Sequence, residues 1–237
     1  MEIGEIITDA LTYPFNNIKA LVIYAVLGIL AAFVLVLTGV SVGTGIGINS
    51  SSLGVLGVIG IIITILIYLL IMGFGLDIIK IGIDKGDGSP DIDFSRQVAN
   101  GIKLLIVAVI YFIIPFIITA LVMYFNNTLG IIVGAILTIV FAFALYMGQC
   151  RLADTEDLAY SANIIEAIKD ALSIGIVKIL IVLILLIIIG FILTFIVSIF
   201  NNFGSVGTFI GALIQGILSI YLTFVQFRAI GLLYSDV

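Results

Sequence analysis

Six long apolar runs alternate with shorter polar segments along the 237-residue chain. The runs cover about residues 18–40, 54–76, 102–125, 130–149, 174–200 and 207–227. Within these runs, charged residues occur only near the ends. A helix needs about 20 apolar residues to cross the hydrocarbon core of a bilayer. The pattern therefore predicts an all-α integral membrane protein with six transmembrane helices.

Two shorter stretches have the spacing of amphipathic helices. In residues 2–16 and 163–172, apolar side chains recur at intervals of three and four residues, and charged side chains occupy the opposite face. Asn163 and Glu166 also have the spacing of a capping box. We therefore predict short amphipathic helices that lead into membrane helices. The pattern leaves open whether the first lies on the bilayer surface or packs against the helical bundle.

The chain also contains a threefold internal similarity. The first membrane helix of each segment begins alike, with IKALVIY at 18–24, IKLLIVA at 102–108 and VKILIVL at 177–183. Two segments end in Gln-x-Arg, at 149–151 and 226–228. An aspartate precedes each first helix: Asp9, Asp93 and Asp170. This similarity predicts three tandem helical hairpins within one membrane domain, 1–237, with repeats at about 2–80, 91–154 and 161–232. The alternative is that apolar helices with an interfacial lysine look alike without being repeats.

Charge is distributed on one side of the predicted membrane. The linkers at 41–53, 126–129 and 201–206 contain no charged residue, and the first of them is expected to be a Gly/Ser-rich loop. The longest polar interval, Asp77–Lys103, is expected to be the main linker facing water. Because basic residues mark the cytoplasmic side, the pattern places this side and both termini in the cytoplasm, in the plasma membrane. The basic residues that set this orientation are Lys19, Lys80, Lys85, Arg96, Lys103, Arg151, Lys169, Lys178 and Arg228.

Composition excludes several classes of function. Only 10% of residues are charged and 63% are hydrophobic, whereas soluble domains carry about 25% charged residues. The net charge of -5 argues against nucleic acid as a partner. The chain has no histidine and one cysteine, which excludes an intrachain disulfide, a Cys/His metal site and catalysis by a histidine base. We expect no metal, no cofactor and no enzymatic activity.

The sixth run carries a stripe of small and polar residues at intervals of four: Gly207, Gly211, Gln215, Ser219 and Thr223. The stripe could line a path for a polar substrate, or pack against another helix through small residues and hydrogen bonds. We favour packing, because ion-coupled transporters usually place charged residues inside the membrane. The sequence thus predicts a non-enzymatic scaffold or assembly component that resides in the lipid bilayer and binds a membrane-protein partner or further copies of itself. The alternative is a channel or carrier for a neutral or lipid-like substrate.

Residues 73–115 carry a pattern of their own. An aromatic helix end at Phe74 runs into Ile79-Lys80, a glycine turn at Gly86 and Gly88, Pro90-Asp91, and a Gly-Ile-Lys helix start at 101–103. This pattern resembles the signature of an uncharacterised multi-pass membrane family common in methanogenic archaea, a domain of unknown function. The resemblance implies a membrane protein from such a source and implies no mechanism. The chain departs from the signature at Asp77, where a basic residue is usual.

Overall fold

The computed structural model describes residues 1–48 and 51–237, with the side chains at 35–54, 56, 201 and 205 left out. The described residues form helices joined by short connections and include no strand. Its elements are α1 (Ile3–Asn16), α2 (Ile18–Ile48), α3 (Ser51–Ile83), α4 (Phe94–Phe125), α5 (Asn127–Thr155), α6 (Leu158–Ser161), α7 (Ile164–Ile174), α8 (Ile176–Ser198), the 3-10 turn η1 (Ile199–Phe203) and α9 (Gly204–Tyr234).

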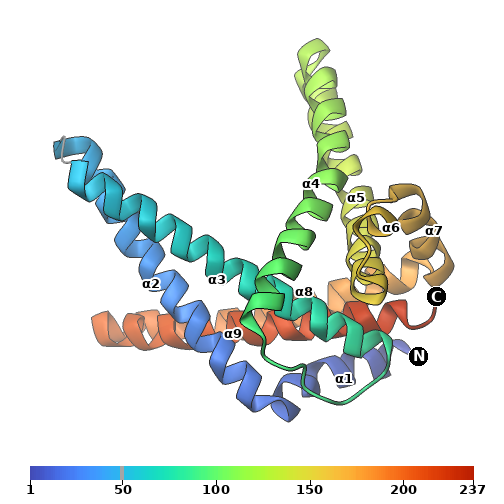
Figure 1. Cartoon of the computed structure of the whole chain (residues 1–237), viewed down its shortest axis with the longest axis horizontal. Helices are drawn as coiled ribbons and strands as arrows, with labels where there is room; N and C mark the ends of the chain where they lie inside the picture. The colour runs from blue at the N-terminus through green and yellow to red at the C-terminus, as the bar shows by residue number, and fades with distance from the viewer. Residues whose placement is uncertain (49–50) are drawn as a thin grey trace.

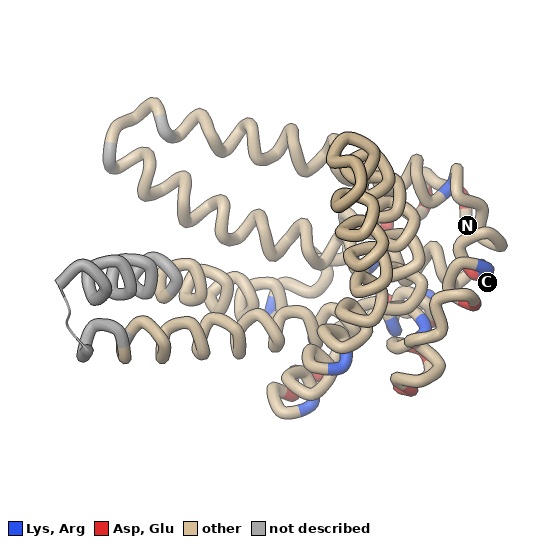
Figure 2. Tube along the Cα trace, turned by 90° about the horizontal axis from the view of Figure 1, so that it is seen from above, with Lys and Arg blue, Asp and Glu red and all other residues tan. Residues whose placement is uncertain are grey.

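Three helical hairpins diverge from a shared base (Figure 1). The pairs are α2 with α3, α4 with α5, and α8 with α9, and the helices α1, α6 and α7 lie at the base, as do both ends of the chain. Figure 2 shows the charged residues gathered at this base, away from the hairpin tips. The predicted separation of charged and uncharged ends is therefore present in the fold.

Five helices are long and apolar enough to cross a membrane, which makes this a membrane-embedded protein. They cover Gly57–Ile83, Phe94–Phe125, Asn127–Thr155, Ile176–Ser198 and Val206–Tyr234. Helix α1 and residues 18–34 of α2 reach the same criterion only together, and a bend of 80° separates them. The described residues therefore hold five or six membrane-spanning helices, against the six predicted.

The helices extend further into the polar segments than the sequence predicted. The interval Asp77–Lys103 is not mainly a linker, because α3 continues to Ile83 and α4 begins at Phe94. The prediction of a loop at 41–53 is also wrong, because α2 reaches Ile48 and α3 begins at Ser51. Residues 49–50 lie outside the described residues. Helices of 31 to 33 residues are about 45–50 Å long, whereas the hydrocarbon core is about 30 Å thick. The additional turns of α3 and α4 at the charged end form much of the base.

Aromatic rings and close glycine contacts join the hairpins at the base. The rings of Tyr24 in α2 and Phe74 in α3 stack with centroids 4.2 Å apart, and Phe224 in α9 lies 5.2 Å from Phe74. Helix α3 also crosses α9 where Gly82 meets Gly231, because a Cβ atom at Gly82 would lie 3.0 Å from the Cα atom of Gly231. The first and third hairpins are therefore in backbone contact.

Candidate functional site

Arg228, near the end of α9, ties three segments of the base together. Its side chain is 1% exposed, and its Nε and Nη2 atoms lie 2.6 and 3.0 Å from the two carboxylate oxygens of Asp9 in α1. Its Nη1 atom donates to the carbonyl oxygen of Gly86, at 2.6 Å. The ring of Tyr13 lies 4.8 Å from the guanidinium carbon. A bidentate carboxylate and a carbonyl oxygen together compensate the buried charge of Arg228.

Arg151, near the end of α5, has an equivalent set of partners. Its Nη1 atom lies 2.7 Å from Oδ2 of Asp170 in α7, and its Nε donates to the carbonyl oxygen of Tyr160 at 3.2 Å. The guanidinium carbon lies 3.7 Å from the centroid of the Tyr160 ring. Asn163 caps α7, because its side chain accepts a hydrogen bond from the backbone N–H of Glu166, which is one of the two bonds of a capping box. Arg151 thus holds α7 and the short helix α6 against the second hairpin.

A third ion pair joins α3 to α4. Arg96 lies 3.1 Å from Asp77 and also donates to the carbonyl oxygen of Asp91, at 3.0 Å. Next to it the fully buried Gln97 accepts a hydrogen bond from the hydroxyl of Tyr24. Arg96 is 47% exposed, so this pair is more hydrated than the other two. In this pair the aspartate lies on the second helix of a hairpin, α3. In the Arg151 and Arg228 pairs, the residue on the second helix of the hairpin is the arginine.

Asp236 anchors the end of α9 to α8. Its carboxylate lies 2.6 Å from Nζ of Lys178 and 3.0 Å from the ammonium group of Met1, and Lys85 approaches to 3.8 Å. The hydrogen bond from Lys178 is the main reason that the pKa of Asp236 lies below its usual value of 3.8, and the Met1 ammonium adds to this effect. The charged form of Asp236 is therefore favoured in the folded protein.

The Asp236 cluster predicts a pH effect on stability. Because the pKa of Asp236 is lower in the folded than in the unfolded chain, its contribution is complete above the unfolded value of 3.8 and is lost as pH falls through the folded value. Asp236→Asn should therefore unfold at a lower temperature than wild type at about pH 6, and the difference should shrink below about pH 4. Thermal unfolding in detergent across this range measures it. A constant difference at all pH values would contradict the assignment.

Most of the basic residues expected to set orientation are held in ion pairs. The residues concerned are Lys80, Lys85, Arg96, Arg151, Lys169, Lys178 and Arg228. Lys19 and Lys103 lie at the second residue of α2 and in the third turn of α4, both at the base. Sequence reasoning missed that Arg151 and Arg228 are buried, and their shared Gln-x-Arg position was the one signal that could have marked them. Each guanidinium of the base is paired with a carboxylate, which suits joining helices.

The small and polar stripe lies along α9, outside these ion pairs. Ser219 donates to the carbonyl oxygen of Gln215 and Thr223 to that of Ser219, each at 2.8 Å. These hydroxyls are thus satisfied within their own helix. Gln215 is half-buried, Gly211 is buried, and Gly207 packs against Phe200 and Phe203 in the preceding turn. Whether the stripe packs or lines a path stays a prediction.

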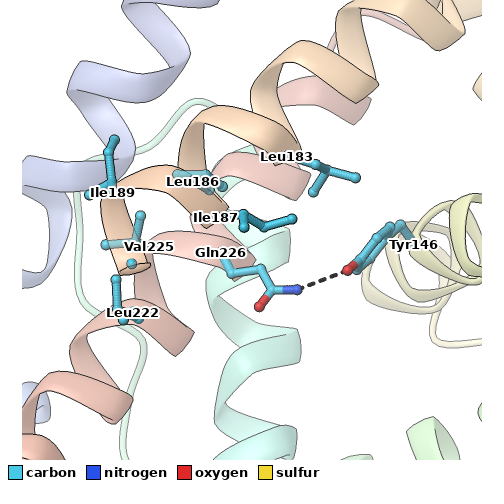
Figure 3. Close-up of a pocket in the computed structure, with 9 residues that line it drawn as sticks. Tyr146, Leu183, Leu186, Ile187, Ile189, Leu222, Val225 and Gln226 are labelled. Atoms are coloured by element: carbon cyan, nitrogen blue, oxygen red, sulfur yellow. Dashed lines mark hydrogen bonds between the residues drawn. The ribbon is translucent and has the colours of Figure 1, made fainter. Parts of the chain in front are cut away.

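An apolar pocket lies between α5, α8 and α9 (Figure 3). Its volume is about 250 Å³, and most of its lining is leucine, isoleucine and valine. Two polar side chains meet at one end, where Nε2 of Gln226 donates to the hydroxyl oxygen of Tyr146 at 3.1 Å. The lone Cys150 of α5 does not line the pocket and is fully buried, which is typical of a packing residue.

Comparison with known proteins places this chain in a family. The matching family is described as "Protein of unknown function (DUF4013)", and its model covers residues 56–202, more than half of the chain. The match includes the second to fifth apolar runs and the Arg151–Asp170 pair, and it excludes α1 and the Arg228 end of α9. No curated protein and no solved structure matches the chain. The chain belongs to DUF4013, a family of proteins of unknown function.

Proposed function

We propose that this protein is a non-enzymatic membrane scaffold that holds a membrane-protein partner or further copies of itself. The observation that carries the proposal is a closed cycle of ion pairs at the base. The end of the first hairpin pairs with the start of the second, through Asp77 and Arg96. The end of the second pairs with α7, which leads into the third, through Arg151 and Asp170. The end of the third pairs with α1, which leads into the first.

The same cycle supports the reading of the chain as three tandem repeats, at about 2–80, 91–154 and 161–232. Aligning the Gln-x-Arg motifs at 149–151 and 226–228 with residues 75–77 puts Asp77 at the position of the two arginines. Asp77 is acidic where the other two repeats have an arginine, and its partner Arg96 is basic where their partners are aspartates. Asp93, the residue expected to correspond to Asp9 and Asp170, instead caps α4 by accepting a hydrogen bond from the backbone N–H of Arg96.

Two further features favour a scaffold over an enzyme. The charged groups of the Arg228–Asp9 and Arg151–Asp170 pairs spend their hydrogen bonds on one another and on backbone carbonyl oxygens, and would be poor acids, bases or nucleophiles. The hairpins diverge from the base, which leaves large apolar surfaces on each arm for lipid or for other membrane helices (Figure 1). Phe116 and Phe125 on α4, for example, are 73% and 83% exposed. A rigid base with separate arms suits a protein that positions partners in the bilayer.

The orientation of the scaffold belongs to the same proposal. The base lies in the cytoplasm with both termini, and the hairpins cross the plasma membrane. Helices α1 and α7 act as the amphipathic helices that lead into the first and third hairpins. Origin in a methanogenic archaeon, which the resemblance of residues 73–115 implies, is part of this prediction.

Charge exchange at the first ion pair tests the repeat. Asp77→Arg alone should lower the free energy of unfolding by about 1–3 kcal/mol, because it places two guanidiniums together. Adding Arg96→Asp should recover at least half of that loss, because it restores an ion pair with the polarity of the other two. Exchanging the exposed pair Glu166 and Lys169 is the control and should change stability by less than about 1 kcal/mol. No recovery in the Asp77/Arg96 exchange would contradict an equivalent ion pair.

The scaffold itself is tested by what copurifies with it. Native mass spectrometry after gentle extraction from its own membrane should show a stoichiometric second protein or several copies of the chain. In intact membranes, Phe125→Cys, which places a thiol at the tip of the second hairpin, should crosslink through a bismaleimide, whereas the wild-type chain, whose lone Cys150 is buried, should not. A monomer without a protein partner, together with no crosslink from Phe125→Cys, would overturn the proposal.

A channel or carrier for a neutral or lipid-like substrate is the second candidate, and the half-buried Gln215 on α9 is the observation that favours it. If the chain is a scaffold, Gln215→Leu should leave the permeability of reconstituted liposomes to glycerol equal to that of wild type. Both should match protein-free liposomes. Glycerol flux through wild type that Gln215→Leu reduces would favour the carrier over the scaffold.

A further inference from the structure

The apolar pocket between α5, α8 and α9 is elongated along the helices, with one end near the base. Leu183 in α8 is five residues beyond Lys178 in the base, and Gly190 lies seven residues further along the helix. At 1.5 Å per residue this distance is about 10 Å along α8. Gln226, two residues before Arg228, lies near the base, and Leu222 lies one helical turn further from it. The pocket therefore begins near the membrane surface and runs toward the bilayer interior.

The polar groups lie at the end of the pocket near the base. Figure 3 shows Tyr146 beside Leu183 and Gln226, while Leu222 and Ile189 lie toward the other end. Among the described residues, the bond between Gln226 and Tyr146 is the one hydrogen bond that either side chain makes. An amide has two N–H donors and an acceptor oxygen, and a phenol has one O–H donor. The pair thus retains an N–H, an O–H and a carbonyl oxygen for a further partner.

We propose that this pocket binds one acyl chain of a bilayer lipid, with an uncharged oxygen of the lipid's glycerol region hydrogen-bonded to Gln226 and Tyr146. The polar end of the pocket faces the membrane surface and its apolar end faces the bilayer interior, as do the glycerol region and the acyl chains of a lipid in the leaflet nearest the base. Its 250 Å³ is below the roughly 300–1,000 Å³ of typical small-molecule sites, which suits a single chain rather than a whole lipid. A partner helix is about 10–12 Å across, so even a 10 Å length of it would fill several times this volume. The site goes beyond the scaffold proposal and does not depend on it.

Gly190 makes the pocket testable without disturbing the fold. A Cβ atom at Gly190 would lie 3.5 Å from Leu222, which is an ordinary contact, so the backbone accepts a side chain there. Gly190→Leu should therefore fill the cavity. Ala212→Leu is the matched control, because it adds the same side chain at an exposed position on α9. Tyr146→Phe and Gln226→Leu remove the polar groups and leave the cavity in place.

The experiment uses the full chain in phosphatidylcholine vesicles that contain a small fraction of a phosphatidylcholine with a diazirine on one acyl chain. After irradiation, peptide mapping should find labelling concentrated on the pocket segments of α8 and α9. Gly190→Leu should reduce that labelling at least fivefold, Ala212→Leu should leave it at the wild-type level, and each polar variant should reduce it about threefold. Uniform labelling of the exposed helix faces, or pocket labelling that Gly190→Leu leaves unchanged, would overturn the proposal. Unchanged labelling in both polar variants would overturn the hydrogen-bonded anchor.

Discussion

Asp9→Ala should lower the free energy of unfolding by about 3–5 kcal/mol, which is the range for removing one partner of a buried ion pair. The reason is that Arg228 would keep its charge while buried at 1% exposure. The carbonyl oxygen of Gly86 and the ring of Tyr13 would remain, but neither carries a negative charge. The carboxylate of Asp87 lies 3.9 Å from Nη2 of Arg228, but its side chain is 95% exposed, so it would compensate the buried charge only weakly. Because this pair joins α1 to α9, the loss should also separate the first and last helices of the base.

The double variant Asp9→Ala/Arg228→Met tests whether the loss of stability comes from the unpaired charge of Arg228 or from the lost contact between α1 and α9. Methionine fills space without a charge, so the double variant should recover most of the loss seen in Asp9→Ala. The exposed pair supplies the comparison, because Lys169→Ala removes an ion pair with Glu166 and should cost no more than about 1 kcal/mol. A double variant as unstable as Asp9→Ala would show that the buried charge is not the source of the loss.

The molecule contains a convenient reporter for these measurements. Cys150 is the only cysteine and is fully buried in α5, so a dye that becomes fluorescent on reaction with thiols detects unfolding. The rise in fluorescence on heating gives the unfolding midpoint in detergent. The same assay verifies that Gly190→Leu and the Asp77/Arg96 exchange remain folded.

The sequence predicted the features that depend on neighbouring residues. Apolar runs of membrane length identified the helices, and the charged positions identified which helix ends lie on the same side. Both properties can be recognised within a short stretch of sequence. Helix ends were less accurate, since α3 and α4 keep their backbone hydrogen bonds beyond the apolar run. Asp77 and Lys80 made residues 77–83 read as part of a linker, although the isoleucines among them continue α3.

The base could not be predicted, because its partners are far apart in the chain. Asp9 and Arg228 are 219 residues apart, and no local pattern joins them. An arginine near a helix end reads as an exposed residue that faces water, yet Arg151 and Arg228 are buried. The departure at Asp77 carried information that the sequence alone did not reveal, namely a partner of opposite charge at Arg96.

Glycine positions show the same limit and lead to the second large effect. The sequence drew attention to Gly207 and Gly211, but a backbone contact between two hairpins involves Gly73 in α3 and Gly101 in α4. A Cβ atom at Gly73 would collide with the backbone carbonyl group of Gln97, and one at Gly101 with that of Leu69. The two glycines thus let α3 and α4 touch backbone to backbone, on both sides of the same crossing.

Gly73→Ala and Gly101→Ala should therefore each lower the free energy of unfolding by about 1–3 kcal/mol, the range for forcing atoms into a packed site. The upper end is expected, because the obstructing atoms are backbone and cannot rotate away. Gly4→Ala in α1 is the control, since a Cβ atom there meets nothing within 4 Å. It should change stability by no more than about 1 kcal/mol, in the stabilising direction that alanine gives a helix. The thiol dye assay compares the three variants, and an unfolding midpoint for Gly73→Ala equal to that of Gly4→Ala would mean that α3 and α4 do not touch at this crossing.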